Sequence, residues 1–210
     1  MVPVVVAPKS ARHSDPGGAE DEFAHLFPDR LAEAVQRALT AETGWEFPNR
    51  PTREATEATL ADAGVERYVA LPYVHEPGGA RSLNAWLAER AEESEPLIPF
   101  ATVHPDDEDV GGIVRDAFEA GARGLKFHCP VQACAPADPR IEPALEAAAE
   151  YDRPVTYHGG TAPMYTEDPH VGPEPFAEAV ESYPDVRVNC AHMGTYDVAE
   201  FVAMAREHDN

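Results

Sequence analysis

Histidines recur along this chain at the ends of short apolar segments, where imidazole could bind a metal ion or transfer a proton. A lone histidine at the end of a strand is more often a plain hydrogen-bonding residue. Repetition at successive strand ends favours a metal or acid/base site, because neutral imidazoles are preferred ligands of zinc-like ions and titrate near neutral pH. Six of the nine histidines follow this pattern: His25, His75, His104, His128, His158 and His192.

The segments around these histidines alternate between two periodicities. Short runs of apolar and β-branched residues predict strands, and residues with helical spacing between them predict helices. Such alternation requires parallel strands joined by helical crossovers. The predicted strands are 23–27, 67–72, 97–103, 123–128, 154–158 and 186–191, and the predicted helices are 31–39, 53–63, 82–94, 109–120, 139–150, 174–183 and 197–207.

Two α/β architectures fit parallel strands, an open doubly wound sheet and a closed barrel. The chain has no glycine-rich dinucleotide fingerprint, which disfavours the open sheet. In a barrel the carboxyl ends of the strands meet on one face, which carries the active site. We therefore predict a TIM-like (β/α) barrel over residues 21–210, incomplete with about six of eight strands. Residues 1–20 contain several prolines and the pair Gly17–Gly18, and we expect them to form a disordered leader.

Charge and composition narrow the class of partner. The net charge is −22, from 38 acidic and 16 basic residues, and the only lysines are Lys9 and Lys126. Such a surface repels nucleic acid and anionic lipid, and it suits the acidic proteome of a halophilic cell with a salt-rich cytoplasm. Three cysteines and no apolar run of about 20 residues favour a cytoplasmic protein with reduced thiols. The open edges of an incomplete barrel favour a homo-oligomer.

Four segments together resemble a known family. These segments are DEFAHLFPD, GARGLKFHCP, RPVTYHGG and VRVNCAHMG. In this order they resemble the strand signatures of the amidohydrolase superfamily, and most of all its amidohydrolase-2 group, which includes aminocarboxymuconate-semialdehyde-decarboxylase-like enzymes. The resemblance covers about residues 21–210. It implies a metal-dependent hydrolase or decarboxylase that acts on a small organic substrate; hydrolysis and decarboxylation both remain open.

The resemblance also implies a site. His25, His158 and His192 match the family's metal-site histidines, and the one matched by His192 either binds the metal or acts as the catalytic acid/base beside a metal-bound water. The ion would be divalent, zinc first, with manganese or iron as alternatives. Asp21, His104, His128 and Lys126 are candidates for contact with the substrate or for support of the ligands. In some members of the superfamily a carbamylated lysine on this strand bridges two metals, but for Lys126 pairing with a carboxylate, for example that of the substrate, is favoured. Tyr157 and Asn189 are expected to line the barrel interior.

Two departures from the family pattern put the activity in question. Phe23 stands where the family has the first histidine of a His-x-His pair, and phenylalanine cannot bind a metal. No seventh or eighth strand is found to supply the usual aspartate ligand. A truncated, catalytically inactive remnant or a binding protein of the same fold is therefore the main alternative. The other is an α/β protein without a metal, whose strand-end histidines are incidental.

Overall fold

The computed structural model describes residues 22–47, 50–161, 165 and 167–210, and these fall into two compact units. The first unit runs up to Pro72 and includes Trp86–Pro99, and the second comprises Tyr73–Ala85 and Phe100–Asn210. The predicted leader, residues 1–20, lies outside the described residues, so its disorder stays a prediction. Among the helices described, none has the length and apolar character needed to cross a lipid bilayer.

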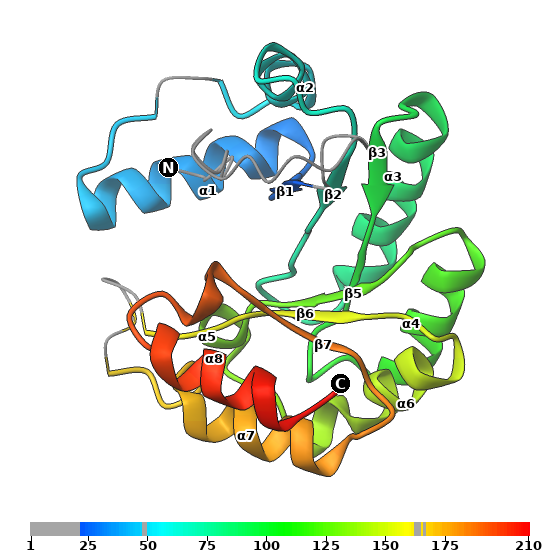
Figure 1. Ribbon diagram of the computed structural model, residues 1–210. Helices are drawn as coiled ribbons and strands as arrows, with labels where there is room; N and C mark the ends of the chain where they lie inside the picture. Colours follow the sequence, from blue (N-terminus) through cyan, green and yellow to red (C-terminus); the bar gives the residue numbers. More distant parts are fainter. Residues whose placement is uncertain (1–21, 48–49, 162–164, 166) are drawn as a thin grey trace. The chain divides into compact units, whose positions relative to one another are not determined.

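The first unit contains a three-stranded parallel sheet in the order β1-β2-β3, labelled in Figure 1. Leu60, Tyr68, Leu87 and Leu97 pack together in its core, with Trp86 at the edge of the cluster. The unit is built from these elements: β1 (Glu22–Ala24), α1 (Asp29–Thr43), α2 (Arg53–Asp62), β2 (Tyr68–Ala70), β3 (Leu97–Pro99) and the later part of α3 (Ala80–Glu93).

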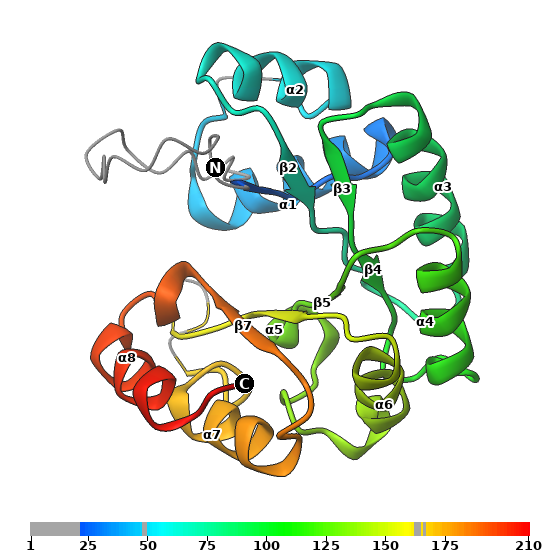
Figure 2. The same ribbon diagram turned by 45° about the vertical axis from the view of Figure 1, so that its right-hand side comes forward.

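The second unit contains a four-stranded parallel sheet in the order β4-β5-β6-β7. Both views show α7 and α8 side by side on one side of β6 and β7 (Figures 1 and 2). The elements are β4 (Ala101–Thr102), α4 (Val110–Glu119), β5 (Leu125–Phe127), α5 (Cys129–Gln132), the 3-10 helix η1 (Pro139–Ile141), α6 (Glu142–Glu150), β6 (Val155–His158), α7 (Pro173–Ser182), β7 (Val188–Ala191), the 3-10 helix η2 (His192–Gly194) and α8 (Val198–Glu207).

The helices of the second unit follow from caps and apolar spacing in the sequence. Asp109 begins α4 by accepting a hydrogen bond from the backbone N–H of Gly112. Helix α4 then buries its apolar residues, among them Ile113, Val114 and Phe118, and packs against α6. Asp138 caps η1 in the same way, by accepting from the N–H of Arg140. The predicted helices are confirmed, with ends shifted by a few residues.

The predicted strand 97–103 is two strands in two different sheets. β3 ends at Pro99, which has no N–H to donate, and β4 begins at Ala101, whose N–H donates to the carbonyl of Gly124. Phe100 between them is buried and packs over Gly124. The other predicted strands each overlap one observed strand, and all pairings are parallel.

Candidate active site

One face of the four-stranded sheet carries a polar residue on every strand. Thr102 is in register with Lys126, Lys126 with Thr156, and Thr156 with Asn189. Residues paired across parallel strands point to the same side of a sheet, so these four residues form a line, here called the polar row. Thr102, Lys126 and Thr156 are buried. Asn189, on the outer strand, is exposed and donates from Nδ2 to Oγ1 of Thr156 at 3.4 Å.

The opposite face of this sheet is apolar and lies under helices. Phe127 and Tyr157 are fully buried, and their rings stack with centroids 5.6 Å apart. Tyr157 also meets Phe176 of α7 edge-on at 5.7 Å. Because side chains alternate along a strand, Tyr157 cannot share a face with its neighbour His158. The expectation that Tyr157 lines the interior is therefore wrong, and this residue belongs to the core under α7.

Three of the predicted histidines come together at the carboxyl ends of neighbouring strands. His128 follows β5, His158 is the last residue of β6, and His192 follows β7. The rings of His128 and His158 stack with centroids 4.4 Å apart and planes 13° from parallel. The ring of His192 lies 5.0 Å from that of His158 at 65°. These residues, here called the histidine row, place three imidazoles side by side, as the parallel topology requires.

Glycines bring the turns after β6 and β7 into contact. A Cβ atom on Gly160 would overlap the backbone of Gly194, and one on Gly159 would overlap the Cys190 sulfur. Glycine can let a ligand approach the backbone closely, but among the described residues the neighbouring turn occupies this space. The absence of side chains here lets the two turns that carry His158 and His192 approach each other.

The turn after β7 is conformationally strained. His192, Met193 and Thr195 have φ values of 62°, 52° and 51°, in the left-handed region that L-residues other than glycine seldom adopt. Each such residue costs on the order of 1–3 kcal/mol unless its surroundings compensate, and strain of this kind gathers at functional sites. The strain is therefore a second reason, beside ring contact, to place His192 in a functional site.

Two tyrosines from loops contact the histidine row. The Tyr73 ring lies 4.6 Å from that of His128 and 5.0 Å from that of His75. Tyr165 meets both stacked histidines edge-on, at 5.9 Å from His128 and 5.6 Å from His158. Burial, and then the nearby Tyr165, raise the pKa of Tyr73 well above its ordinary value. Tyr73 therefore remains a neutral phenol at physiological pH.

Lys126 supplies a buried amine beneath the histidine row. Its side chain is 1% exposed, and burial lowers its pKa to about 7, against an opposing effect of the Cys129 and Cys190 thiols. The pKa of His192 is also lowered, first by partial desolvation of its ring and second by Lys126. Although His192 as a residue is exposed to solvent, protein packed around its ring accounts for that desolvation. A neutral His192 can act as a metal ligand or as a base.

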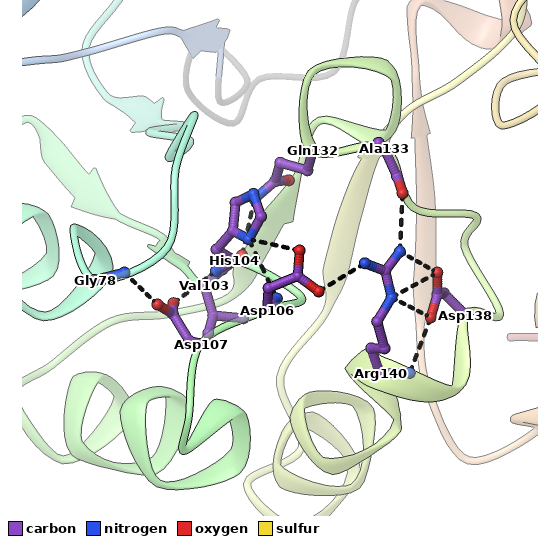
Figure 3. Close-up of polar contacts among 9 residues, drawn as sticks. All are labelled: Gly78, Val103, His104, Asp106, Asp107, Gln132, Ala133, Asp138 and Arg140. Carbon is purple, nitrogen blue, oxygen red and sulfur yellow. Dashed lines mark hydrogen bonds and ion pairs between the residues drawn. The ribbon is translucent and has the colours of Figure 1, made fainter.

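His104 is held in a hydrogen-bonded network (Figure 3). Its backbone N–H donates to Asp107, and its Nδ1 accepts from the N–H of Asp106 at 3.2 Å. Arg140 joins Asp106, at 2.8 Å, to Asp138. The loop after β4 is thereby tied to the segment after α5. This network supports the loop that carries His104 and gives it a structural role.

Gln132 ties α5 to the end of β4 and to the histidine row. Its Oε1 accepts from the N–H of His128 at 2.7 Å, and its Nε2 donates to the carbonyl of Val103 at 2.8 Å. The side chain is buried, so both bonds lie away from water. Gln132 therefore fixes the backbone from which the His128 ring projects.

His25 belongs to the first unit, directly after β1. Its Nδ1 lies 2.7 Å from the carbonyl oxygen of Leu71, and because a carbonyl only accepts, Nδ1 carries the proton. The lone pair is then on Nε2, the arrangement that orients a metal-binding histidine. Asp21 lies outside the described residues.

A bound divalent ion needs several donor side chains directed at one point. Within the described part of the chain, no three His, Cys, Asp or Glu side chains gather in the geometry of a metal site. The second unit supplies His158 and His192 from adjacent strand ends, and imidazole nitrogen suits zinc, manganese and iron. These two imidazoles are donors of a kind that suits the divalent ion implied by the sequence.

Comparison with known proteins places the chain in a family. A family model described as amidohydrolase matches residues 21–210, and the chain therefore belongs to the amidohydrolase family. A search of curated proteins gives no match.

Solved structures with the same fold include enzymes of two reaction types. A 5-carboxyvanillate decarboxylase from Novosphingobium aromaticivorans, solved with manganese, is 19% identical with a TM-score of 0.61, covering 91% of this chain and 71% of that one. A 2,6-dihydroxybenzoate decarboxylase from Rhizobium is 17% identical with a TM-score of 0.56, covering 85% and 67%. A probable 2-pyrone-4,6-dicarboxylic acid hydrolase from Acinetobacter baumannii is 14% identical with a TM-score of 0.54, covering 87% and 64%.

At these identities the likeness concerns the fold alone. The predicted α/β class, of the TIM-like (β/α) barrel type, is confirmed by the parallel sheets and by these structures. Sequence reasoning missed Tyr73, Tyr165 and the threonines of the polar row. The threonines had a signal in the sequence: β4, β5 and β6 each lead into a histidine through an apolar–polar–apolar pattern, as ATVH, LKFH and VTYH. The tyrosines lie in loops, which have no periodicity to reveal them.

Proposed function

We propose that this chain is a metal-dependent amidohydrolase-type enzyme, a hydrolase or decarboxylase acting on a small organic substrate. The observation that carries the proposal is the approach of the His158 and His192 rings to 5.0 Å at the ends of neighbouring strands. His25 would be the third ligand, a role taken from the sequence motif and supported by its protonated Nδ1. Zinc is the first choice of ion; manganese and iron are the alternatives.

In the proposed reaction, residues of the second unit have different roles. A bound divalent ion lowers the pKa of water or polarises a carbonyl or carboxylate. His192 takes up or returns a proton at its ring nitrogen, since its lowered pKa keeps it neutral near pH 7. Tyr73 and Tyr165 lie against the His128–His158 stack, where they can orient a planar substrate and exclude water.

The proposal covers two reaction types, hydrolysis and decarboxylation. The similar structures include decarboxylases and a probable hydrolase. A divalent ion beside a group that transfers protons can serve either reaction. Manganese in the Novosphingobium enzyme supports a divalent ion here. The proposal therefore rests on the family and on the histidines, and it leaves the substrate to experiment.

The test is the metal content of the purified chain. After incubation with zinc, manganese or ferrous iron and removal of the excess, we expect about one bound ion per chain by mass spectrometry of the metals. His158→Ala and His192→Ala should each lower that content severely, and His25→Ala should do the same. His208→Ala, at the end of α8, is the matched control and should retain the ion.

Each outcome separates the alternatives. Absence of bound metal in the wild-type chain, or full retention by His158→Ala, would contradict the proposal. One bound ion without turnover of any carboxylate or amide substrate would favour the binding protein. In that case restoring the first ligand with Phe23→His is the informative variant, because Phe23 stands at the missing histidine.

A further inference from the structure

We propose that the polar row binds a carboxylate of the substrate, with Lys126 as its cation and Thr102 and Thr156 as hydroxyl donors. The inference rests on the proposed function, because it adds to that site the residues that orient the substrate. It makes Lys126 a specificity-determining residue, since substrates without a suitably placed carboxylate would lack a partner for it.

The first observation is a buried amine without an acidic partner. Lys126 is 1% exposed on the central strand β5, and among the described residues no Asp or Glu pairs with it. Buried ammonium groups are almost always paired, because taking the charge out of water is costly. In a chain with 38 acidic residues and 16 basic ones, an acidic partner would be easy to supply. A carboxylate ligand would provide the missing charge.

The second observation is a buried hydroxyl next to it. Thr102 is fully buried, and among the described residues its Oγ1 has no hydrogen-bond partner. Such groups are uncommon and each calls for an explanation, such as a ligand. The register puts Thr102 beside Lys126 on the same face of the sheet. The amine and the hydroxyl therefore stand together, and a single acceptor could satisfy both.

Thr156 completes the arrangement on the other side of Lys126. It is in register with Lys126 and fully buried, and its Oγ1 accepts from Asn189. A hydroxyl that accepts one hydrogen bond still has its own hydrogen to donate. Lys126 thus lies between two hydroxyls that can both donate. A carboxylate has two oxygens and accepts only, which matches donors in a line.

The polar row also lies close to the histidine row, where the reaction is proposed to take place. Lys126 and Thr156 precede His128 and His158 by two residues, so the two pairs share one face and are separated by about 6–7 Å along the strands. A carboxylate held by the polar row would place the rest of the substrate beside the histidine row.

The experiment measures carboxylate binding to the metal-free chain. Benzoate is titrated into protein kept in a chelator, by calorimetry, with benzamide as the uncharged counterpart. Benzoate suits the tyrosines that contact the stacked histidines. Without metal, binding to an ion cannot account for the affinity. We expect benzoate to bind and Lys126→Met to weaken it by roughly tenfold or more, the effect of one lost charge-assisted hydrogen bond.

Matched variants test the other members of the site. Thr102→Val should weaken benzoate by a few-fold, and Thr102→Ser, which keeps the hydroxyl, should restore it. Arg123→Met removes one exposed positive charge just before the same strand and should leave affinity unchanged. Benzamide affinity should be the same in wild type and Lys126→Met. Circular dichroism of each variant confirms that it is folded.

Several results would overturn the inference. These are no benzoate binding to the wild type, equal binding by Lys126→Met, or an equal loss in Arg123→Met. Chloride or phosphate that displaces benzoate at similar concentrations would show a general anion site and would also overturn it. A chain that binds metal but fails these tests loses only this inference, whereas Lys126-dependent benzoate binding without metal binding would sink only the proposed function.

Discussion

The two faces of the four-stranded sheet differ sharply in chemistry. One face is formed by residues such as Leu125, Phe127 and Tyr157, which are fully buried in apolar surroundings. The other carries Lys126, with the rest of the polar row, and His128 and His158 of the histidine row, and much of it is also buried. Strands of parallel sheets usually read as apolar runs, because both faces are covered. Here they alternate instead.

Within a single strand, residues on one face pack in the core, and residues on the other face carry the polar groups of the proposed site. Phe127 holds β5 against the core. Lys126 on the same strand and His128 directly after it lie on the other side and carry an amine and an imidazole group. Buried polar groups cost stability unless they are bonded, so a sheet that buries a row of them has a use for them other than packing. We therefore expect substitution of Phe127 on the apolar face to lower the free energy of unfolding, and substitution of Lys126 on the polar face to raise it.

The largest effect is expected on the apolar face. Phe127→Ala removes a fully buried ring that stacks on Tyr157, and should lower the free energy of unfolding by about 3–5 kcal/mol. Thr156→Val, in the paired strand but on the polar face, should change it by less than about 1 kcal/mol. Urea denaturation followed by circular dichroism measures both. Equal losses would mean that the two faces do not differ as described.

Lys126→Met should stabilise the fold near neutral pH. The pKa of Lys126 is about 7 in the folded chain and about 10.4 when unfolded, so the unfolded chain binds the extra proton between these values. Folding is therefore penalised below pH 10.4, and the penalty grows as pH falls, until it levels off near pH 7. At pH 7 the free energy of unfolding of the variant should be higher than that of wild type by on the order of a few kcal/mol.

The pH series supplies the control for this prediction. The advantage of Lys126→Met over wild type should shrink as pH rises and vanish about one pH unit above the unfolded pKa of about 10.4, where both folded and unfolded lysine are largely neutral. Arg123→Met should show no such trend. A difference between wild type and Lys126→Met that does not vary with pH would show that Lys126 keeps its charge in the folded chain.

The helices and the grouping of the strand-end histidines could be predicted from the sequence. Apolar residues at helical spacing located the helices, and the parallel topology predicted that strand-end histidines would lie side by side. His158 and His192 confirm that expectation by ring contact. Their role as metal ligands, together with that of His25, stays a prediction.

Other features depend on contacts that local patterns do not encode. The break at Phe100 arises where Pro99 cannot donate and Ala101 pairs with a different sheet. Tyr73 and Tyr165 reach the histidines from loops, and a loop position has no period from which to infer its neighbours. Tyr157 lies on the helix-covered side of the sheet, and its hydroxyl donates to the carbonyl of Pro136 within the core, a contact that the local pattern does not indicate.

A smaller effect is expected where Gln132 supports the polar face. Gln132→Leu keeps the volume but leaves two buried backbone groups, the N–H of His128 and the carbonyl of Val103, without their partner. The expected cost is about 1–3 kcal/mol, seen as a lower unfolding temperature. Hydrogen exchange at the His128 amide should also accelerate. Unchanged exchange there would show that Gln132 does not restrain this end of β5.

The smallest effect is expected at the Arg140 network, which is mostly exposed. Arg140 contacts Asp106 at 2.8 Å and Asp138 at 2.6 Å, but such ion pairs are worth at most about 1 kcal/mol, and salt screens them. Arg140→Ala should therefore lower stability by less than Gln132→Leu, and the loss should shrink further in molar salt. Arg140→Lys should recover only part of it, because an ammonium cannot reproduce the guanidinium fork between two carboxylates. A loss that persists in molar salt would show that Arg140 acts mainly through its hydrogen bond to the carbonyl of Ala133 and through packing.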